Sequence, residues 1–417
     1  MKILFITEEL PYPLDSGGNV RTFNLMKSLA TRHEIILIAT SRYPLDEAAM
    51  AVLSPICKKI RIVKIPNRGL FSEAWTVVNC LIRSRSLILS RHRYRAVKRA
   101  IVSELRLDKN AQAGASSGHI DAVYFNHLDS AVYEPLIPKG IFRILDEHNV
   151  LFNQARSMLG AQHNFVRGAL LRREVHFLKK IEPHVCNKMD LCLTCSEVDA
   201  LALRNLGVTT AIVEIPNGVD VSAFAWDEKI AERAHEVVFF GTLDYPPCEQ
   251  GIWFFLKGIF PLLYSADPTL SVKIVGRNPS RRLTEFSASC SNVRVMGRVP
   301  DIRSYVQCAR VCIVPLLSGS GTRLKILEAF ALGTPVVSTT IGAEGICATN
   351  GEHLLVSDEP REFAAHVLDL VRSREKSLQI SRNARSLVEE KYDWKKIGDS
   401  LIEQLEKANF SNNRICV

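Results

Sequence analysis

The sequence has no apolar segment long enough to cross a membrane. A span needs about 20 consecutive apolar residues, and the most apolar stretch, WTVVNCLIRSRSLIL, is interrupted by Arg83 and Arg85. The first residues, MKILFIT, reach Glu8 and Glu9 before the apolar part of a secretory signal can form. We therefore expect a cytoplasmic protein, with peripheral association at the inner face of the cytoplasmic membrane as the second candidate location.

Motifs that usually mark metal or nucleic-acid sites are also missing. The chain has no Asp-x-Asp triplet and no His-Glu-x-x-His, so we expect no metal and no cofactor. Aromatic residues make up 7% of the chain, and no helix-turn-helix, zinc-finger or RNP-like pattern stands out. Nucleic acid is therefore a disfavoured partner.

The eleven cysteines favour a structural role. Most lie inside apolar runs, where cysteine behaves as a small hydrophobic residue. Cys192 and Cys195 form a CxxC, but they lie in a strand-like stretch without a second pair. We interpret them as packing residues in a reducing compartment.

Positive charge is concentrated in two segments. The net charge is +9, and the segment from Lys58 to Lys109 holds fourteen Lys or Arg against three acidic residues. A second basic segment extends from Arg156 to Lys188. Such fields attract anionic partners, including nucleic acid, acidic lipid headgroups and phosphorylated substrates. A solvated surface that keeps the chain soluble is the alternative.

Short apolar runs alternate with helical patterns along all 417 residues, a length that favours two domains. This alternation is typical of an α/β fold with doubly wound parallel sheets. We expect strands at KILFIT, EIILIAT, IRIVKI, DAVYFN, FRILDE, DLCLTC and AIVEIP, and in the second half at EVVFFGT, LSVKIVG, NVRVMG, VCIVPL, PVVSTT and HLLVSD.

A turn signal in IPNGVDVSAF separates the two halves. We expect Rossmann-like domains at residues 1–217 and 218–396, facing an interdomain cleft, and a C-terminal helix and tail at 397–417 that packs back on the first domain. Ligands of open parallel sheets bind beyond the carboxyl ends of the strands. The loops that follow the strands are therefore the candidate sites.

The loop SGSGTRLKILEA has the composition of an anion site. A glycine-rich segment opens into an amphipathic helix whose start Ser320 or Thr322 can cap. Free N–H groups at that end, with Arg323 and Lys325, suit phosphate oxygens. Glu328 lies one turn after Lys325 and can accept hydrogen bonds from two ribose hydroxyls. The pattern therefore favours a nucleotide, although an exposed Lys325–Glu328 ion pair is the alternative.

Several segments in order resemble the retaining family-four glycosyltransferases of GT-B architecture (glycosyl transferases group 1). The segment GSGTRLKILEAFALGTPVVSTTIGAEGI resembles their donor-binding segment. The N-terminal MKILFITEELPYPLDSGGNVRTFNLMKSLA resembles their first strand, Gly-Gly loop and first helix. EIPNGVDVSAF resembles their interdomain link, and VRVMGRVPDIRSYVQCARVCIVPL the segment that leads to the donor loop.

The resemblance implies a role for each matching position. Glu328 would bind the ribose, Arg323 and Lys325 would neutralise the leaving diphosphate, and His148 would face the transferred sugar, with His127 as the rival histidine. The first domain would bind the acceptor and the second the donor. The implied catalytic residues are His148, Arg323 and Lys325. The implied donor-binding residues are Gly17, Gly18, Gly241, Thr242, Arg298, Val299, Gly319, Ser320, Gly321, Thr322, Leu324 and Glu328.

Two departures from the family pattern affect these assignments. Ser320 stands where the first of two glutamates is usual, so sugar contacts would fall to backbone N–H groups of the loop. GTLDYPPCEQG lacks the Arg and Lys often found there, which places more weight on Arg323 and Lys325. Without an Asp-x-Asp, these cations rather than Mg²⁺ or Mn²⁺ would stabilise the diphosphate.

The resemblance implies a retaining, metal-independent transfer from a nucleoside-diphosphate sugar to a saccharide or lipid-linked saccharide, as in surface-polysaccharide assembly. A nucleotide-sugar epimerase of similar fold, a nucleic-acid- or partner-binding protein, and an inactive subunit are the alternatives. The segment FVRGALLRREVHFLKKIEPHV mixes apolar residues with cations. It is a candidate interfacial helix on an anionic membrane, or else a helix that packs on the sheet.

Overall fold

The computed structural model describes residues 1–42, 47–66, 69–83, 85–111, 119–160, 165–226, 233–319 and 321–413. The chain forms two compact units. The N-terminal unit comprises Met1–Pro216 together with Gly398–Val417, and the C-terminal unit comprises Asn217–Ile397. The main division therefore lies one residue before the boundary expected from the sequence, and the final residues group with the N-terminal unit.

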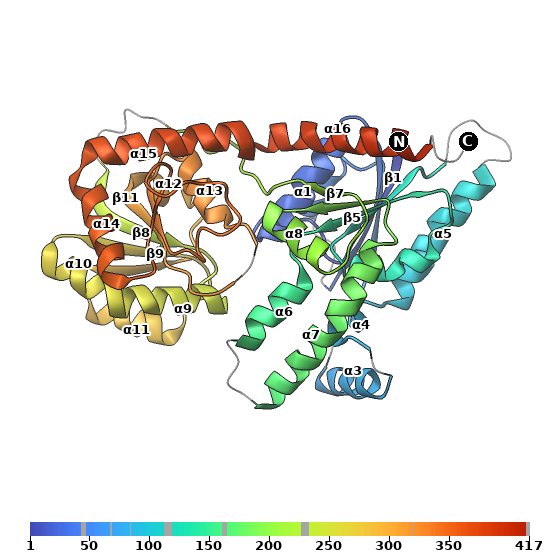
Figure 1. Cartoon of the computed structure of the whole chain (residues 1–417), viewed down its shortest axis with the longest axis horizontal. Helices are drawn as coiled ribbons and strands as arrows, with labels where there is room; N and C mark the ends of the chain where they lie inside the picture. The colour runs from blue at the N-terminus through green and yellow to red at the C-terminus, as the bar shows by residue number, and fades with distance from the viewer. Residues whose placement is uncertain are drawn as a thin grey trace. The chain divides into compact units, whose positions relative to one another are not determined.

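The N-terminal unit is built on a seven-stranded parallel sheet with the order β3-β2-β1-β4-β5-β6-β7 (Figure 1). Its central strands are almost continuously buried, as expected for apolar runs covered on both faces. All seven expected strands form. They are β1 (Lys2–Thr7), β2 (Glu34–Ser41), β3 (Lys59–Lys64), β4 (Ala122–Asn126), β5 (Phe142–Glu147), β6 (Leu191–Thr194) and β7 (Ile212–Glu214).

The helices of this unit are α1 (Gly17–Leu29), α2 (Glu47–Leu53), α3 (Leu70–Ile82), α4 (Leu87–Ser90), α5 (Arg95–Ala111), α6 (Leu151–Gly160), α7 (Phe165–Cys186) and α8 (Glu197–Asn205), with a 3₁₀ segment at Ser130–Leu136. The resemblance placed Gly17 and Gly18 in a loop before the first helix, which is wrong, because α1 begins at Gly17. Ser16 caps α1 by accepting a hydrogen bond from Asn19 N, so the two glycines form its first turn.

Helix α7 packs on its unit through a regular stripe. Glu174, Leu178, Glu182 and Cys186 are buried at intervals of four residues, which places them on one helical face. The Glu182 carboxylate accepts hydrogen bonds from the first backbone N–H groups of α6. The segment read as a candidate interfacial helix is therefore a packed helix along most of its length.

The C-terminal unit has a six-stranded parallel sheet with the order β10-β9-β8-β11-β12-β13. The six expected strands form as β8 (Ala234–Phe240), β9 (Ser271–Val275), β10 (Val293–Gly297), β11 (Ala309–Val314), β12 (Val336–Ser338) and β13 (Leu355–Val356). The helices are α9 (Pro246–Phe254), α10 (Phe260–Ala266), α11 (Arg281–Ser289), α12 (Arg303–Cys308), α13 (Leu324–Ala331), α14 (Pro360–Arg372) and α15 (Arg374–Leu387). Helix α16 (Trp394–Asn413) begins in this unit and belongs to the N-terminal unit from Gly398 onward. Two π-helical turns, Phe255–Ile259 and Val388–Tyr392, join α9 to α10 and follow α15.

Membrane, thiol and metal features of the described residues are as follows. None of the described helices combines the length and the hydropathy needed to cross a bilayer. The ten cysteines in this part of the chain are free thiols, and Cys192 and Cys195 are buried. No group of three or more His, Cys, Asp or Glu side chains in the described ranges is placed to hold a metal ion.

Candidate functional site

The loops after three strands of the C-terminal unit are packed backbone against backbone. Gly241 N, after β8, donates to Val275 O at 3.0 Å, and Gly276 N, after β9, donates to Gly297 O at 2.9 Å. A Cβ on Gly276 would lie 1.7 Å from the carbonyl oxygen of Gly241, so only glycine fits there. Thr242 continues this loop. The carboxyl ends of β8, β9 and β10 therefore form one continuous rim.

Lys325, in the first turn of α13, reaches this rim. A Cβ built on Gly241 would lie 2.8 Å from Lys325 Nζ. The ammonium lies 4.5 Å from the ring centroid of Phe239 and 3.5 Å from Cys248 Sγ. No carboxylate of the described residues lies within ion-pair distance of it. A cation with no described carboxylate at ion-pair distance, at the carboxyl end of a parallel sheet, is a suitable partner for a bound anion.

Glu328 lies one turn further along α13 and is partly buried. Burial raises the pKa of its carboxyl to about 7, although the nearby Lys325 ammonium lowers that pKa. Its oxygens accept no hydrogen bond from the side chains or backbone of the described residues. The alternative of an exposed Lys325–Glu328 ion pair is therefore wrong, because Lys325 contacts Phe239 and Cys248 instead.

The glycine-rich loop before α13 uses backbone angles that favour glycine. Gly319 has φ +117° and Gly321 has φ +80°. A Cβ on Gly319 would lie 3.0 Å from Nη2 of Arg323, which is 9% exposed. Burial lowers the pKa of the Arg323 guanidinium. The loop backbone therefore folds closely around this cation. Ser320 lies outside the described residues.

The helix start differs from the sequence expectation. Thr322 does not cap α13: Arg323 is the N-cap residue and no side chain caps the helix. The Thr322 hydroxyl oxygen is buried and has no hydrogen-bond partner in the described chain. A buried hydroxyl of this kind costs free energy unless a ligand or water satisfies it. Within the first turn, Ile326 N donates to Arg323 O at 2.9 Å.

Three further predicted donor residues border this region. Arg298 follows β10 and is exposed. Val299 and Leu324 are partly buried and pack against the core of the unit. The structure thus gathers Gly241, Lys325 and Arg323 with the glycine-rich loop, and it places Arg298 and Val299 at the end of the strand next to β9.

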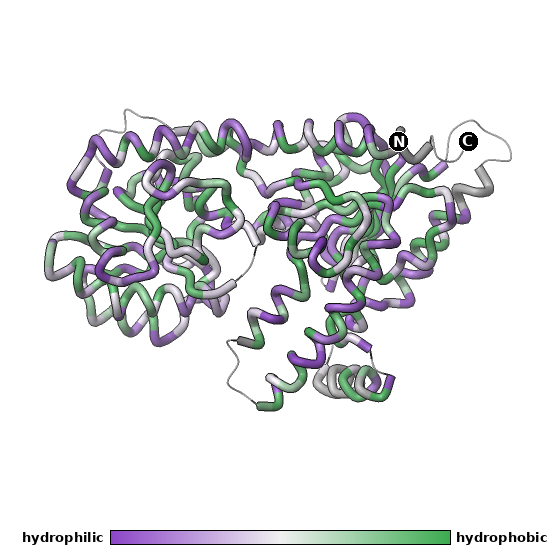
Figure 2. The backbone as a smooth tube through the Cα atoms, in the orientation of Figure 1, coloured by the Kyte–Doolittle hydropathy of each residue, from purple (hydrophilic) through white to green (hydrophobic). Residues whose placement is uncertain are grey.

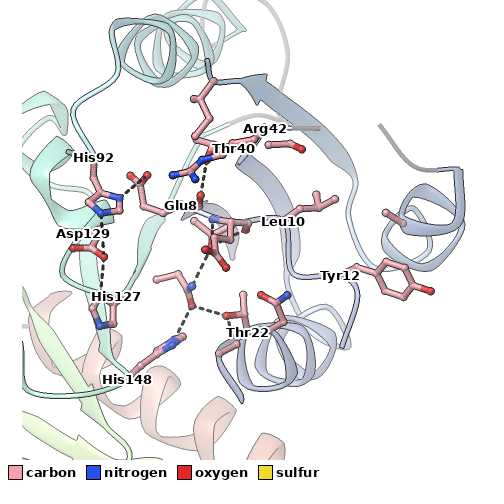
Figure 3. Close-up of a pocket in the computed structure, with 18 of the residues that line it drawn as sticks. Glu8, Leu10, Tyr12, Thr22, Thr40, Arg42, His92, His127, Asp129 and His148 are labelled. Carbon is pink, nitrogen blue, oxygen red and sulfur yellow. Dashed lines mark hydrogen bonds and ion pairs between the residues drawn. The ribbon is translucent and has the colours of Figure 1, made fainter. Parts of the chain in front are cut away.

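The N-terminal unit has its own pocket of about 720 Å³ at the carboxyl ends of β1, β2, β4 and β5 (Figure 3). It is lined by residues that follow those strands, by the start of α1 and by the segment after α4. The polar residues among them are Thr7, Glu8, Glu9, Asn19, Thr22, Thr40, Ser41, Arg42, His92, Asn126, His127, Asp129, His148 and Asn149.

His148 lies in this pocket together with Gly18, in the first turn of α1. Its Nε2 is 3.1 Å from Asn126 Oδ1 and 3.4 Å from Asp146 Oδ2. A Cβ on Gly18 would lie 3.8 Å from His148 Nδ1, so the first turn of α1 passes directly beside the ring. Burial lowers the pKa of His148, although Asp146 opposes that shift. The histidine is therefore held as a neutral, hydrogen-bonded ring.

A chain of alternating acids and histidines lines the other side of the pocket, and sequence analysis missed most of it (Figure 3). His92 Nδ1 lies 3.2 Å from Glu8 Oε2, and His92 Nε2 lies 3.7 Å from Asp129 Oδ2. Asp129 Oδ2 also lies 3.4 Å from His127 Nδ1. Glu8 and His127 each follow a strand, a signal that could have found them. Nothing local in the sequence identifies His92.

The pKa values of these acids and histidines depend on one another. Burial raises the pKa of Glu8, while His92 lowers it. Burial alone would lower the pKa of His127, but its ion pair with Asp129 produces a net rise. The same ion pair holds the pKa of Asp129 below its usual value despite burial. His127 is thus the more readily protonated of the two predicted histidines.

The fold has many solved relatives, among them the Anabaena protein Alr3699/HepE, whose structure with UDP has a TM-score of 0.66. The two chains are 14% identical, and the match covers 98% of this chain and 100% of that one. The arrangement is the GT-B fold, with two Rossmann-like α/β units.

Sequence comparisons add a family match in the C-terminal unit. Residues 234–373 match the profile described as Glycosyl transferases group 1. A protein of the Klebsiella pneumoniae cps region, described as uncharacterized, is 22% identical over 419 residues, which is 97% of this chain and 99% of that protein. The phosphatidyl-myo-inositol mannosyltransferase of Mycolicibacterium smegmatis is 27% identical over 214 residues, 49% of this chain and 54% of that one. Together these findings support a glycosyltransferase of GT-B architecture.

Proposed function

We propose that this chain moves a sugar from a nucleoside-diphosphate sugar to a saccharide or lipid-linked saccharide acceptor, with retention of configuration. The observation that carries the proposal is the pair formed by Lys325 and Glu328. One turn of α13 presents an ammonium with no carboxylate partner among the described residues and, beside it, a carboxylate that accepts no hydrogen bond there. In this proposal, the ammonium binds the diphosphate and the carboxylate binds the ribose hydroxyls.

The C-terminal unit supplies the donor site in this proposal. Lys325 and Arg323 neutralise the diphosphate, with the N–H groups of the glycine-rich loop and the helix start as further donors. Glu328 accepts hydrogen bonds from the ribose hydroxyls. The backbone at Arg298 and Val299 contacts the base, and the buried Thr322 hydroxyl contacts a phosphate or sugar oxygen.

The N-terminal unit supplies the acceptor site. Its pocket of about 720 Å³ has the size range of small-molecule sites, and its carboxylates and imidazoles suit a polyhydroxylated ligand. His148 contacts the reacting sugar through a neutral ring. Glu8 and Asp129, tied together by His92, accept hydrogen bonds from acceptor hydroxyls.

The chemical step needs no side-chain nucleophile. The acceptor oxygen forms a bond to the anomeric carbon on the face from which the diphosphate leaves, as the carbon–oxygen bond to the diphosphate breaks. An oxygen of the departing phosphate takes the proton of the acceptor hydroxyl. Lys325 and Arg323 stabilise the negative charge that develops on this leaving group, so we propose a metal-independent transfer.

Relatives support a role in surface-polysaccharide or glycoconjugate assembly. HepE has been solved with UDP-glucose, and the Klebsiella relative is described as lying in a cps region. The mycobacterial relative is named for a lipid acceptor. These descriptions agree with a nucleotide-sugar donor and a saccharide or lipid-linked acceptor for this chain.

The test is a panel of UDP-, GDP- and TDP-sugars, with thermal stabilisation and nucleotide-sugar turnover as the measurements. We expect stabilisation by one nucleotide class and slow release of nucleoside diphosphate, both weakened in Lys325→Ala and Glu328→Gln. Proton NMR of the product with an acceptor shows retention through the anomeric coupling constant. Conversion of the donor to an epimer without acceptor would instead indicate an epimerase. No binding of any nucleotide sugar would refute the proposal.

A further inference from the structure

Two helix segments of the N-terminal unit expose large apolar side chains to solvent. On α3, Trp75 is 71% exposed and Ile82 is 78% exposed. At the start of α7, Phe165 is 82% exposed and Val166 is 67% exposed. Together with Val78, these residues are called the apolar tip. Figures 1 and 2 show both segments extending from the same end of this unit, below its sheet.

A partly buried polar clamp connects the end of α3 to α7. Arg173, in the middle of α7, donates to Cys80 O at 2.6 Å and to Arg85 O at 2.8 Å. The neighbouring Glu174 accepts a hydrogen bond from Leu87 N, at the start of α4, at 2.8 Å. The end of α3 is therefore fastened to α7. The outward apolar residues belong to a fixed helix and cannot turn inward without breaking this clamp.

The exposed charges described on α7 and directly after α3 are positive. Both carboxylates of α7, Glu174 and Glu182, are buried and hydrogen-bonded inward. The exposed cations that follow α3 or lie on α7 are Arg83, Arg85, Arg167, Arg172, Lys179 and Lys180. The described solvent side of these elements thus combines aromatic and aliphatic groups with cations.

We propose that the apolar tip docks the N-terminal unit on an anionic lipid bilayer. Tryptophan prefers the boundary between headgroups and acyl chains, and aliphatic side chains gain by entering it. The surrounding cations match the charge of anionic headgroups. Two projecting helix segments can insert into a bilayer, because a bilayer presents no fixed pocket that their shape must match. This proposal does not depend on the sugar-transfer chemistry.

Vesicle sedimentation tests the proposal with the full chain and no nucleotide sugar. The vesicles contain phosphatidylcholine alone or an equal mixture with phosphatidylglycerol, at low and at high salt. We expect binding to the mixed vesicles at low salt, weaker binding at high salt because ions screen the cations, and little binding to phosphatidylcholine. If the protein stays in the supernatant with the mixed vesicles at low salt, the proposal is wrong.

Two sets of variants separate the apolar and the charged contributions. Trp75→Ser with Ile82→Ser removes exposed apolar groups, and Arg83→Glu with Arg85→Glu reverses two charges. Each pair should lower the vesicle partition coefficient roughly tenfold or more. The matched controls in the C-terminal unit are Leu262→Ser with Tyr264→Ser, and Lys395→Glu with Lys396→Glu, all exposed. Equal binding by the tip variants and the wild type would overturn the proposal.

Tryptophan fluorescence reports insertion directly. The chain has four tryptophans, so the difference between wild type and Trp75→Phe isolates the emission of Trp75. We expect this emission to shift to shorter wavelength on mixed vesicles. If light scattering instead shows a dimer that the tip variants abolish, and vesicles bind nothing, the tip is a self-association surface and the proposal fails. Nucleotide-sugar binding by the same variants keeps this result separate from the proposed function.

Discussion

Arg21 and Asp146 form a fully buried, bidentate ion pair in the N-terminal unit. Arg21 Nε lies 3.0 Å from Asp146 Oδ2, and Arg21 Nη2 lies 2.6 Å from Oδ1. Arg21 Nη1 also donates to Ile215 O at 2.7 Å, so one side chain ties α1 to β5 and to the last residues before Asn217. Asp146 also lies 3.4 Å from His148 Nε2, and the pair therefore supports the histidine of the pocket.

Arg21→Met should strongly destabilise the N-terminal unit. Burial favours the neutral carboxyl, but Arg21 holds the pKa of Asp146 far below its usual range, so removing the guanidinium leaves a buried charge unpaired. Breaking one partner of such a pair costs about 3–5 kcal/mol, measured by urea denaturation. The control is Arg303→Met, which breaks the exposed pair with Asp301 and should cost less than about 1 kcal/mol. Similar losses in both variants would contradict this reading.

Lys325→Ala and Arg323→Ala should each reduce turnover on the order of 10²-fold or more, because each removes a cation from the leaving diphosphate. Steady-state kinetics with saturating donor measures the effect, and circular dichroism checks the fold. Lys257→Ala is the control, since that exposed lysine lies over Trp253 and away from the rim. Near-normal turnover in the double variant would remove both residues from the mechanism.

Glu328→Gln should weaken nucleotide-sugar binding by roughly 1–3 kcal/mol, the cost of a lost charge-assisted hydrogen bond. Because the pKa of Glu328 is raised to about 7, the wild-type carboxyl ionises as the pH rises through 7, and affinity should increase across that window. A nucleotide sugar is the appropriate ligand in calorimetry, since its diphosphate does not titrate there. A wild-type affinity that is flat across this window, or equal to that of the variant, would argue against the ribose contact.

The same carboxyl predicts a stability profile without ligand. Its folded-state pKa lies above its ordinary value of 4.5, so the folded chain binds more protons than the unfolded chain between pH 4.5 and about 7. Stability should therefore fall as the pH rises through this window. The difference between wild type and Glu328→Gln in denaturant titrations at several pH values isolates this contribution. A pH-independent difference would mean that the carboxyl titrates normally.

His148→Ala should reduce turnover more than His127→Ala if His148 contacts the reacting sugar, with a loss on the order of 10²-fold. Burial lowers the pKa of His148, with Asp146 opposing and Arg21 and His127 adding to the shift. The ring is therefore mostly neutral at pH 6.5, and protonation of His148 should not lower wild-type turnover as the pH drops to that value. His127 has a raised pKa. A larger loss in His127→Ala would reverse the assignment.

Excess EDTA should leave most of the activity, because protein cations are proposed to stabilise the leaving group. Turnover with and without EDTA, followed by addition of Mg²⁺ or Mn²⁺, measures the dependence. Complete loss that a divalent ion restores would show that a metal takes part in the reaction.

Sequence periodicity predicted both parallel sheets because most strands are short runs of apolar residues, which is the pattern of strands buried on both faces of a sheet. The rule that ligand loops follow such strands also led to the loop of Lys325, whereas Gly241 and His148 were implied by the family resemblance. Local signals failed at helix starts. Helix α1 begins at Gly17, with Ser16 as its N-cap, although the resemblance placed Gly17 and Gly18 in a loop. The composition of the donor loop suggested a Thr322 cap that the structure does not form.

Residues brought together by topology could not be predicted in the same way. Arg21 and Asp146 are 125 positions apart, and a buried arginine on an amphipathic helix has the same sequence pattern as an exposed one. His92 joins Glu8 and Asp129 although it follows a short helix and no strand. Only the crossover order of the sheet determines which of these side chains meet.

Helix α16 contributes its first residues to the C-terminal unit and its remainder, from Gly398 onward, to the N-terminal unit. A Cβ on Gly398 would lie 2.1 Å from Ser28 Oγ, so this segment packs tightly against α1. During synthesis on the ribosome, the N-terminal unit must therefore wait for its last helix until residues 217–397 have been translated. At 5–20 residues per second, that delay is about 10–40 s, during which residues 1–216 lack the helix that completes their unit.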